Sequence, residues 1–340
     1  MANTANSTLT TDFNVTPYYD DYDQYKSFHR ILFKSGYAVQ GRELTQLQTI
    51  LQQQINRFGK HMFREGSIVL PGAFTLEMNS GKDIGRGIPY VKIDDLDTSN
   101  NTVNVNTWSK AVIRGNTSNI TAQVIEVLDG AQATAKPKTF YIRYTSVSSA
   151  NSSIKTFQPG ETLYANVDGI IYTANVANNV ANNTGFGSRF SISEGVFFAK
   201  EHFVAFPTQS IIVDRYSPNP TAKVGFYVTE EIITASQDAS LLDPAQEASN
   251  YSAPGADRLK LNPQLTVFDF SANVASPDFV ELFSINEGVV QTYLERTQYN
   301  IITDELAKRT YDESGDYVVR GLDVQIREHD DTGNNYGRFA

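Results

Sequence analysis

Residues 163–176 read LYANVDGIIYTANV, and this stretch indicates the fold class because it predicts a β-hairpin. Its two halves, Leu163–Val167 and Ile170–Val176, are rich in the β-branched and aromatic residues that fit a pleated sheet. Asp168 and Gly169 stand between them, and this dipeptide is typical of a two-residue type I′ turn. The sequence therefore predicts two antiparallel strands joined by a tight turn.

Similar strand patterns occur on both sides of this hairpin. Alternating or β-prone residues are found in five further segments: Thr102–Asn106, Thr139–Val147, Val204–Asp214, Val224–Thr234 and Gly321–Glu328. Charged residues make up only 19% of the chain, which suits β-rich surfaces better than helical bundles. The 340 residues are enough for two or three domains, each with its own core. We therefore expect a mainly β (α+β) fold with several β-sandwich-like or small-barrel modules.

One long amphipathic helix is predicted from about Gly41 to Glu65. Apolar residues recur there at steps of three and four, which places them on one helical face: Leu44, Leu47, Leu51, Ile55, Phe58 and Met62. Glutamines and Asn56 fill much of the opposite face, which is polar and almost uncharged. Two interpretations stay open. The apolar face packs in a core while the polar face meets solvent, or the glutamine face binds a partner without the desolvation cost of charge.

The segment before this helix is aromatic and acidic, and it shows neither a helical nor a strand period. It is expected to be an extended arm. Tyrosine is enriched at protein interfaces, so we expect the arm to dock onto a neighbouring protein. The arm and the glutamine face together supply the predicted partner-docking residues: Tyr18, Tyr19, Tyr22, Tyr25, Gln46 and Gln53.

Composition and pattern divide the chain into four regions. They are the arm (1–38), a docking region with the helix and a first strand (39–81), a β-rich insertion (82–188), and a β-rich domain that is expected to continue beyond this chain (189–340). The last region contains a long loop, Ser236–Gly255, and a short helix near residues 304–311 with Thr303 as its N-cap. The turn-like sequence Ser191–Val196 recurs as Ser284–Val289, and each copy is expected to lead into a strand.

The composition also excludes several functional classes. The chain has no cysteine, which excludes disulfides, thiolate metal sites and cysteine nucleophiles. Its formal net charge of −10 disfavours nucleic acid, because binding to phosphates rests on lysine and arginine. No stretch approaches the roughly 18 apolar residues of a membrane span, and residues 1–12 lack the pattern of a signal peptide. We therefore expect neither nucleic acid nor a membrane as a partner.

No cluster of residues carries a recognisable chemistry. The four histidines lack the spacing of a metal site: His29, His61, His202 and His329. Asp95, Asp97, Ser99 and Asn101 resemble the opening of a calcium loop, but the central glycine and the terminal glutamate of such a loop are missing. Gly185–Gly187 lacks the third glycine of a dinucleotide site. We predict no catalytic, cofactor-binding or metal site, and we do not expect an enzyme.

Three stretches carry a resemblance to a known family. They are HRILFKSGYAVQGRELTQLQ at residues 29–48, YSAPGADRLK at 251–260, and ERTQY at 295–299 running on to RTYDESGDYVV at 309–319. These stretches resemble a family of virion structural proteins of tailed bacteriophages, frequent in cyanophages, that are described as baseplate or tail-fibre proteins. The region 82–188 matches this family least.

The resemblance implies a structural part of a phage tail without catalytic residues. The expected role is a baseplate wedge protein, or an adaptor that connects tail fibres to the baseplate, with other baseplate and tail-fibre proteins as partners. The expected location is the virion, after assembly in the cytoplasm of the bacterial host. Fibres and adaptors are commonly three-fold, so a homo-oligomer is expected, with a trimer favoured over a dimer. The alternative is a tail-fibre or tailspike protein that acts as a host-glycan adhesin or depolymerase.

Overall fold

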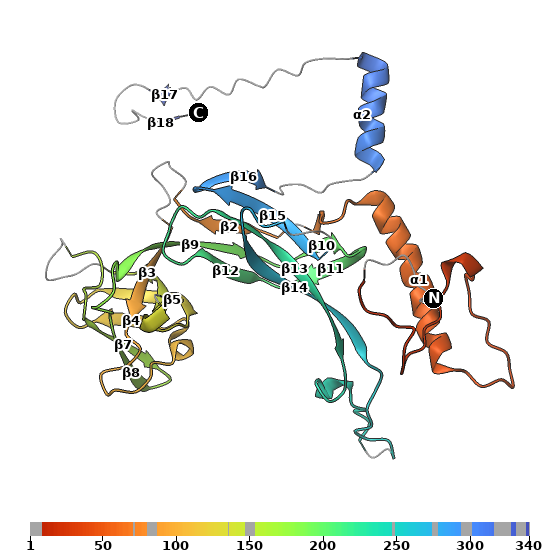
Figure 1. The fold of residues 1–340 in the computed structure, drawn as a ribbon, viewed down its shortest axis with the longest axis horizontal. Coiled ribbons are helices and arrows are strands. Elements are labelled where there is room, and N and C mark those ends of the chain that lie inside the picture. Colours follow the sequence, from red (N-terminus) through yellow and green to blue (C-terminus); the bar gives the residue numbers. More distant parts are fainter. Residues whose placement is uncertain are drawn as a thin grey trace. The chain divides into compact units, whose positions relative to one another are not determined.

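A computed structural model of the chain describes residues 9–70, 72–79, 87–134, 136–146, 154–246, 249–273, 278–293, 301–315, 328–330 and 338–339. Strands dominate these ranges and two α-helices accompany them, so the fold is mainly β with α+β character, as predicted (Figure 1). Residues 1–298 form one compact unit and residues 299–340 form a second.

Six antiparallel strands of the first unit form a β-barrel. In the order of their hydrogen bonding they are β3 (Ile88–Ile93), β6 (Lys138–Tyr144), β5 (Thr121–Leu128), β4 (Val112–Gly115), β7 (Thr162–Val167) and β8 (Ile170–Asn175). The two end strands meet where Ile93 bridges Val176 and the Asp94 N–H donates to the Asn175 carbonyl at 2.9 Å. Closure of the barrel pairs the edges that an open sheet would expose. The interior is apolar and includes Val91, Ile113, Val124, Phe140, Ile142 and Leu163.

The hairpin predicted from residues 163–176 is confirmed as the pair β7 and β8. Asp168 has a φ of 53° and Gly169 a φ of 84°, so both turn residues adopt the left-handed conformation that a type I′ turn requires. Val167 pairs directly with Ile170 across this turn. The dipeptide therefore sets the register of the barrel hairpin.

The strand predicted at Thr102–Asn106 is wrong. Thr102 forms only an isolated bridge with Leu96, and the chain then turns into a 3₁₀ helix, η2 (Val105–Trp108). The Asn104 side chain caps this helix by accepting a hydrogen bond from the Asn106 N–H. Local capping thus replaces strand pairing, while Val105 and Trp108 are still buried in the barrel.

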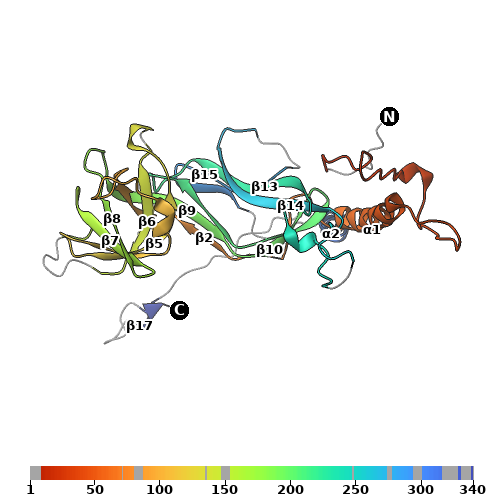
Figure 2. The same ribbon diagram turned by 90° about the horizontal axis from the view of Figure 1, so that it is seen from below.

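Strand β9 (Thr184–Ile192) belongs to two sheets. Its first half pairs with β3 of the barrel, where Ile88 lies opposite Gly187. Its second half pairs with β12 (Gln209–Asp214) and β2 (Phe74–Glu77). Figures 1 and 2 both show β9 running out of the barrel into the neighbouring β-structure.

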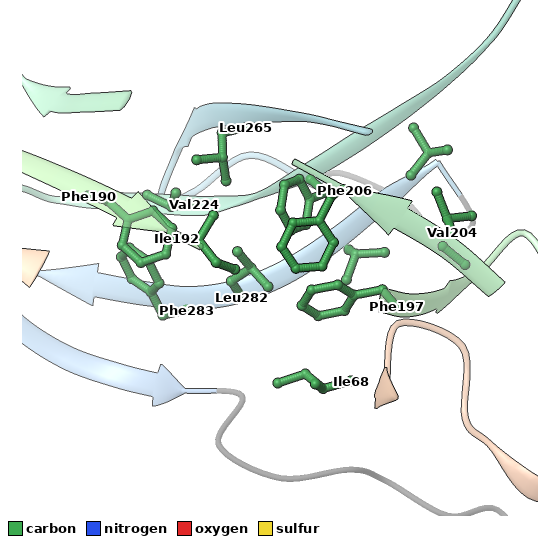
Figure 3. Packing of buried hydrophobic residues seen from close by; sticks show 14 of the residues in the cluster. Ile68, Phe190, Ile192, Phe197, Val204, Phe206, Val224, Leu265, Leu282 and Phe283 are labelled. Atoms are coloured by element: carbon green, nitrogen blue, oxygen red, sulfur yellow. The ribbon is translucent and has the colours of Figure 1, made fainter. Parts of the chain in front are cut away.

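This neighbouring structure is a sandwich-like arrangement of sheets around one aromatic core. The sheet β14-β13-β15-β16 comprises β14 (Arg258–Asp269), β13 (Ala222–Ile233), β15 (Phe279–Asn286) and β16 (Val289–Tyr293). A three-stranded sheet comprises β1 (Ile68–Leu70), β10 (Gly195–Ala199) and β11 (His202–Phe206). Side chains from both sheets and from β9 meet in the cluster of Figure 3, which includes Phe190, Phe197, Phe206 and Phe283. The rings of Phe190 and Phe283 lie 4.6 Å apart between centroids.

Most strand predictions in this region are confirmed. The predicted segment 224–234 corresponds to β13, and the segment 204–214 contains parts of two strands, β11 and β12. The segment 236–255 is a loop, apart from the short 3₁₀ helix η4 (Ala239–Leu241). The strand predicted at Gly321–Glu328 lies, except for its last residue, outside the described residues.

The repeated turn sequence leads into a strand in both places, as predicted. Ser284–Val289 forms the hairpin between β15 and β16, which pair with each other. Ser191–Val196 instead joins β9 to β10, and each of these pairs with other strands. The same short sequence therefore serves as a hairpin and as a corner between sheets.

Helix α1 (Gly41–Met62) confirms the predicted long helix and ends three residues before the predicted end. A second α-helix, α2 (Ile301–Ser314), includes the predicted short helix and is longer, so Thr303 lies inside the helix and the prediction that it is the N-cap is wrong. The described elements also include η1 (Gln24–Lys26), η3 (Gln132–Thr134), β17 (Glu328–Asp330) and β18 (Arg338–Phe339). Neither helix in the described part of the chain is long and apolar enough to cross a membrane.

Candidate docking surface

Helix α1 buries its polar face and exposes its apolar face. The buried residues of the helix are Ile50, Gln53, Asn56 and Gly59, and Gln53 is only 7% exposed. By contrast, Leu51 is 56% exposed and Phe58 is 62% exposed. The expectation that the apolar stripe packs in a core is therefore wrong. The physical reason is that this chain supplies specific polar partners to the opposite face.

The arm supplies the first set of these partners, and Figure 2 shows it beside α1. Thr49 Oγ1 donates a hydrogen bond to the Asp20 carboxylate. Gln46 Nε2 donates to Asp21 Oδ1 at 3.2 Å. Arg57 is also within hydrogen-bond distance of the arm, at the Gln24 side chain. These contacts occupy the glutamine face from within the chain.

The turn between β10 and β11 supplies the second set of partners. Lys60 Nζ lies 2.6 Å from Glu201 Oε1, and the Glu201 side chain is nearly buried. Gly59 lets the helix approach the strand, because a Cβ at this position would lie 2.5 Å from the Phe198 ring. Phe63, directly after the helix, packs edge-on against Phe203 with a centroid distance of 5.7 Å. Polar and close-packed contacts together fix α1 on the sandwich.

The start of the described arm is held by Glu230 on β13. Its carboxylate accepts hydrogen bonds from the Thr10 and Thr11 N–H groups and from Thr11 Oγ1. Lys200 Nζ lies 2.7 Å from Glu230 and 2.7 Å from Asp278. We call Thr10, Thr11, Lys200, Glu230 and Asp278 the arm clamp.

Electrostatics favour the charged forms of Glu230 and Lys200 in the arm clamp. Burial opposes ionisation of Glu230, but hydrogen bonds from Lys200, Thr11 and Thr10 outweigh this and lower the Glu230 pKa to about 2. Burial likewise opposes the charge on Lys200, but its hydrogen bonds to Asp278 and Glu230 raise the Lys200 pKa above its usual value. The clamp therefore ties the arm to the sandwich through a paired, buried charge.

The exposed side of α1 is apolar along its length. We call its five exposed apolar residues the apolar face: Leu44, Leu47, Leu51, Ile55 and Phe58. The segment that leads into the helix exposes more apolar side chains: Phe28, Leu32, Phe33, Tyr37 and Val39. Exposed glutamines flank the apolar face, and Leu44–Asn56 contains no charged residue. Large exposed apolar areas of this kind mark interaction surfaces.

The predicted docking residues fall into two groups. Tyr22 is buried, Gln53 is buried and Gln46 is bonded to the arm, so these three make contacts within the chain. Tyr18 is partly buried and donates to Asp257 Oδ2 at 2.7 Å. Tyr19 and Tyr25 are exposed, and their role in docking stays a prediction. The leucines of the apolar face are not among the predicted docking residues, because their period predicts burial in a core.

The other candidate residues do not converge on a chemical site. Asp97 Oδ1 accepts hydrogen bonds from the Ser99 and Asn101 N–H groups, and these bonds lower the Asp97 pKa. The carboxylate thus holds its own loop. Gly185–Gly187 lies within β9. Among the described residues, no three His, Cys, Asp or Glu side chains are placed to hold a metal ion.

A small polar cavity lies between the arm and α1. It has a volume of about 130 Å³ and is lined by Gln24, Gln53, Asn56, Arg57, Lys60 and Glu201. Small-molecule sites typically measure roughly 300–1,000 Å³. Two of the lining residues, Lys60 and Glu201, neutralise each other. The cavity therefore belongs to the packing of the arm against the helix.

The fold and this surface define a mainly β protein that presents an amphipathic helix with its apolar side outward. The chain belongs to the family described as "Domain of unknown function (DUF4815)", whose sequence profile matches residues 16–133 and 180–336. The unmatched residues between these two ranges contain the barrel strands β6, β7 and β8. No curated protein and no solved structure matches the chain.

Proposed function

We propose that this chain is a structural component of a tailed-phage virion, either a baseplate protein or an adaptor that joins tail fibres to the baseplate. The observation that carries the proposal is the apolar face of α1, because leucine, isoleucine and phenylalanine are normally buried. The resemblance of residues 29–48 to virion structural proteins supports the same role, and this stretch includes the start of the apolar face. Other baseplate and tail-fibre proteins are the proposed partners.

The way in which α1 is held supports a role in assembly. A helix whose polar face is bonded to Asp20, Asp21 and Glu201 keeps a fixed orientation, so its apolar face is a preformed surface. Preformed surfaces bind with a smaller loss of conformational entropy than flexible ones.

The proposal is tested by incorporation of the chain into phage tails. We expect the double variant Leu51→Gln/Phe58→Gln to be depleted in purified tails, as measured by quantitative mass spectrometry. The matched control is Ile170→Gln/Ile171→Gln in the barrel hairpin, since both isoleucines are also exposed. Absence of the wild-type chain from tails would contradict the proposal. Release of reducing ends from host polysaccharide by the purified chain would support the depolymerase alternative instead.

A further inference from the structure

We propose that the apolar face of α1 packs against the same face of other copies of this chain, with the helices parallel around a rotation axis. This inference rests on the proposed role in assembly and names the first partner, which is a second copy of the chain.

The apolar residues follow an eleven-residue spacing. Leu44 and Ile55 are eleven positions apart, as are Leu47 and Phe58, and as are Leu51 and Met62. Eleven residues correspond to three turns of 3.67 residues, which is close to the natural period of an α-helix. The stripe therefore runs almost parallel to the helix axis. Identical helices can meet along such a stripe over its whole length.

The flanks of the apolar face are complementary to themselves. A parallel arrangement of identical helices brings identical residues to the same level, so charged flanks would place like charges next to each other. Here the flanking residues Gln48, Gln52 and Gln54 are exposed and uncharged. A glutamine amide both donates and accepts hydrogen bonds, so it can pair with a copy of itself.

Helix α2 is an exposed helix that lacks an uncharged, apolar outer face. Its residues 305–314 are all exposed, as much of α1 is. It carries charges of both signs, and Glu305 and Arg309 form an ion pair within the helix. Leu306 and Tyr311 are the only large apolar side chains among these residues of α2. The uncharged, apolar exterior of α1 is therefore not a general feature of exposed helices in the described part of this chain.

Disulfide trapping offers a direct test, because the natural chain contains no cysteine. In the Leu44→Cys variant, mild oxidation is expected to join two copies, because Leu44 lies at one end of the apolar face and only a parallel bundle brings this position together in neighbouring helices. Ile171→Cys is the control, since Ile171 is 69% exposed but lies on β8 of the barrel. We expect a disulfide-linked dimer for the helix variant and none for the control. The absence of a link at residue 44 would contradict the parallel arrangement.

Introducing a charge at Gln54 tests the role of the uncharged flanks. Light scattering of the wild-type chain is expected to give a multiple of the chain mass, whereas Gln54→Lys alone and Gln54→Glu alone each weaken the association. Mixing the two variants is expected to restore it, because opposite charges then face each other. A wild-type monomer at micromolar concentration would overturn the inference. If that monomer still entered phage tails through Leu51 and Phe58, the proposed function would stand and only the partner would be wrong.

Discussion

The barrel and helix α1 both carry a regular apolar pattern, but the barrel buries its apolar residues and the helix exposes them. In the barrel, alternate residues point inward, and Val91, Ile113 and Leu163 are fully buried. In α1, the periodic residues Leu44, Leu51 and Phe58 point away from the chain. The barrel thus completes its core within one chain, whereas the helix leaves its apolar side exposed. A periodic pattern shows which residues need burial, but it does not show which molecule provides it.

The largest effect is expected from the barrel core. Phe140 is fully buried and lies against Trp108, with a distance of 5.2 Å between ring centroids. Phe140→Ala should lower the free energy of unfolding by about 3–5 kcal/mol, because it leaves a cavity among side chains that cannot collapse fully. Trp108 is the sole tryptophan, so its fluorescence during urea denaturation reports on the barrel directly. A loss below about 1 kcal/mol would mean that the barrel core is not closed.

The second largest effect is expected from the arm clamp. Glu230→Gln removes one partner of Lys200, whose side chain is only 3% exposed. The free energy of unfolding should fall by about 3 kcal/mol, the lower end for a broken buried ion pair, because Asp278 still faces the lysine. Limited proteolysis should also cut the arm sooner. A fully resistant arm would show that other contacts hold it.

The same clamp predicts a pH dependence of stability. The Glu230 pKa is lowered to about 2 in the folded chain, from an ordinary value of 4.5. A depressed carboxyl pKa stabilises the fold above its ordinary value, and this stabilisation is lost as the pH falls from about 4.5 towards 2. The difference in unfolding free energy between the wild type and Glu230→Gln should therefore shrink over this range. A difference that stays constant from pH 6 to pH 2.5 would contradict the assignment.

Much of the fold follows from local sequence. The pair Asp168-Gly169 predicts its hairpin because the turn conformation is set by these two residues themselves. The period from Leu44 to Met62 likewise predicts a helix. The inward side of that helix could not be predicted, because it is chosen by distant partners. Thr49 meets Asp20 across 29 positions, and Lys60 meets Glu201 across 141 positions.

The candidate site was predicted only in part for the same reason. The sequence indicates that the arm and helix form a docking region, but it assigns docking to Gln53 rather than to Leu51. A glutamine-rich helical face is typical of an external surface, and the sequence does not show that the chain's own arm covers it. The prediction of a strand at Thr102–Asn106 is wrong for a local reason. The Asn104 side chain accepts a hydrogen bond from the Asn106 N–H, and the backbone turns into a 3₁₀ helix there.

The next prediction compares two neighbouring residues of α1. Ile50 is 5% exposed and Leu51 is 56% exposed. Ile50→Ala should lower the free energy of unfolding by about 2 kcal/mol, because it removes most of a buried side chain and leaves a cavity. Leu51→Ala should change it by less than about 0.5 kcal/mol when the protein is diluted until it is monomeric. Denaturation curves of the two variants measure this contrast, and equal losses would mean that α1 is buried on both sides.

The smallest effect is expected from an exposed ion pair between the arm and the helix. Arg42 Nη1 lies 3.4 Å from Asp21 Oδ2, and both side chains are about half exposed. Such pairs contribute little because solvent screens the attraction and ordering two long side chains costs entropy. Arg42→Ala should therefore change the free energy of unfolding by less than about 0.5 kcal/mol and leave the proteolysis of the arm unchanged. Glu230→Gln serves as the positive control in the same assays. If Arg42→Ala released the arm as readily as the clamp variant does, the arm would be held at its exposed contacts, and α1 would lose the fixed orientation on which its role as a docking surface depends.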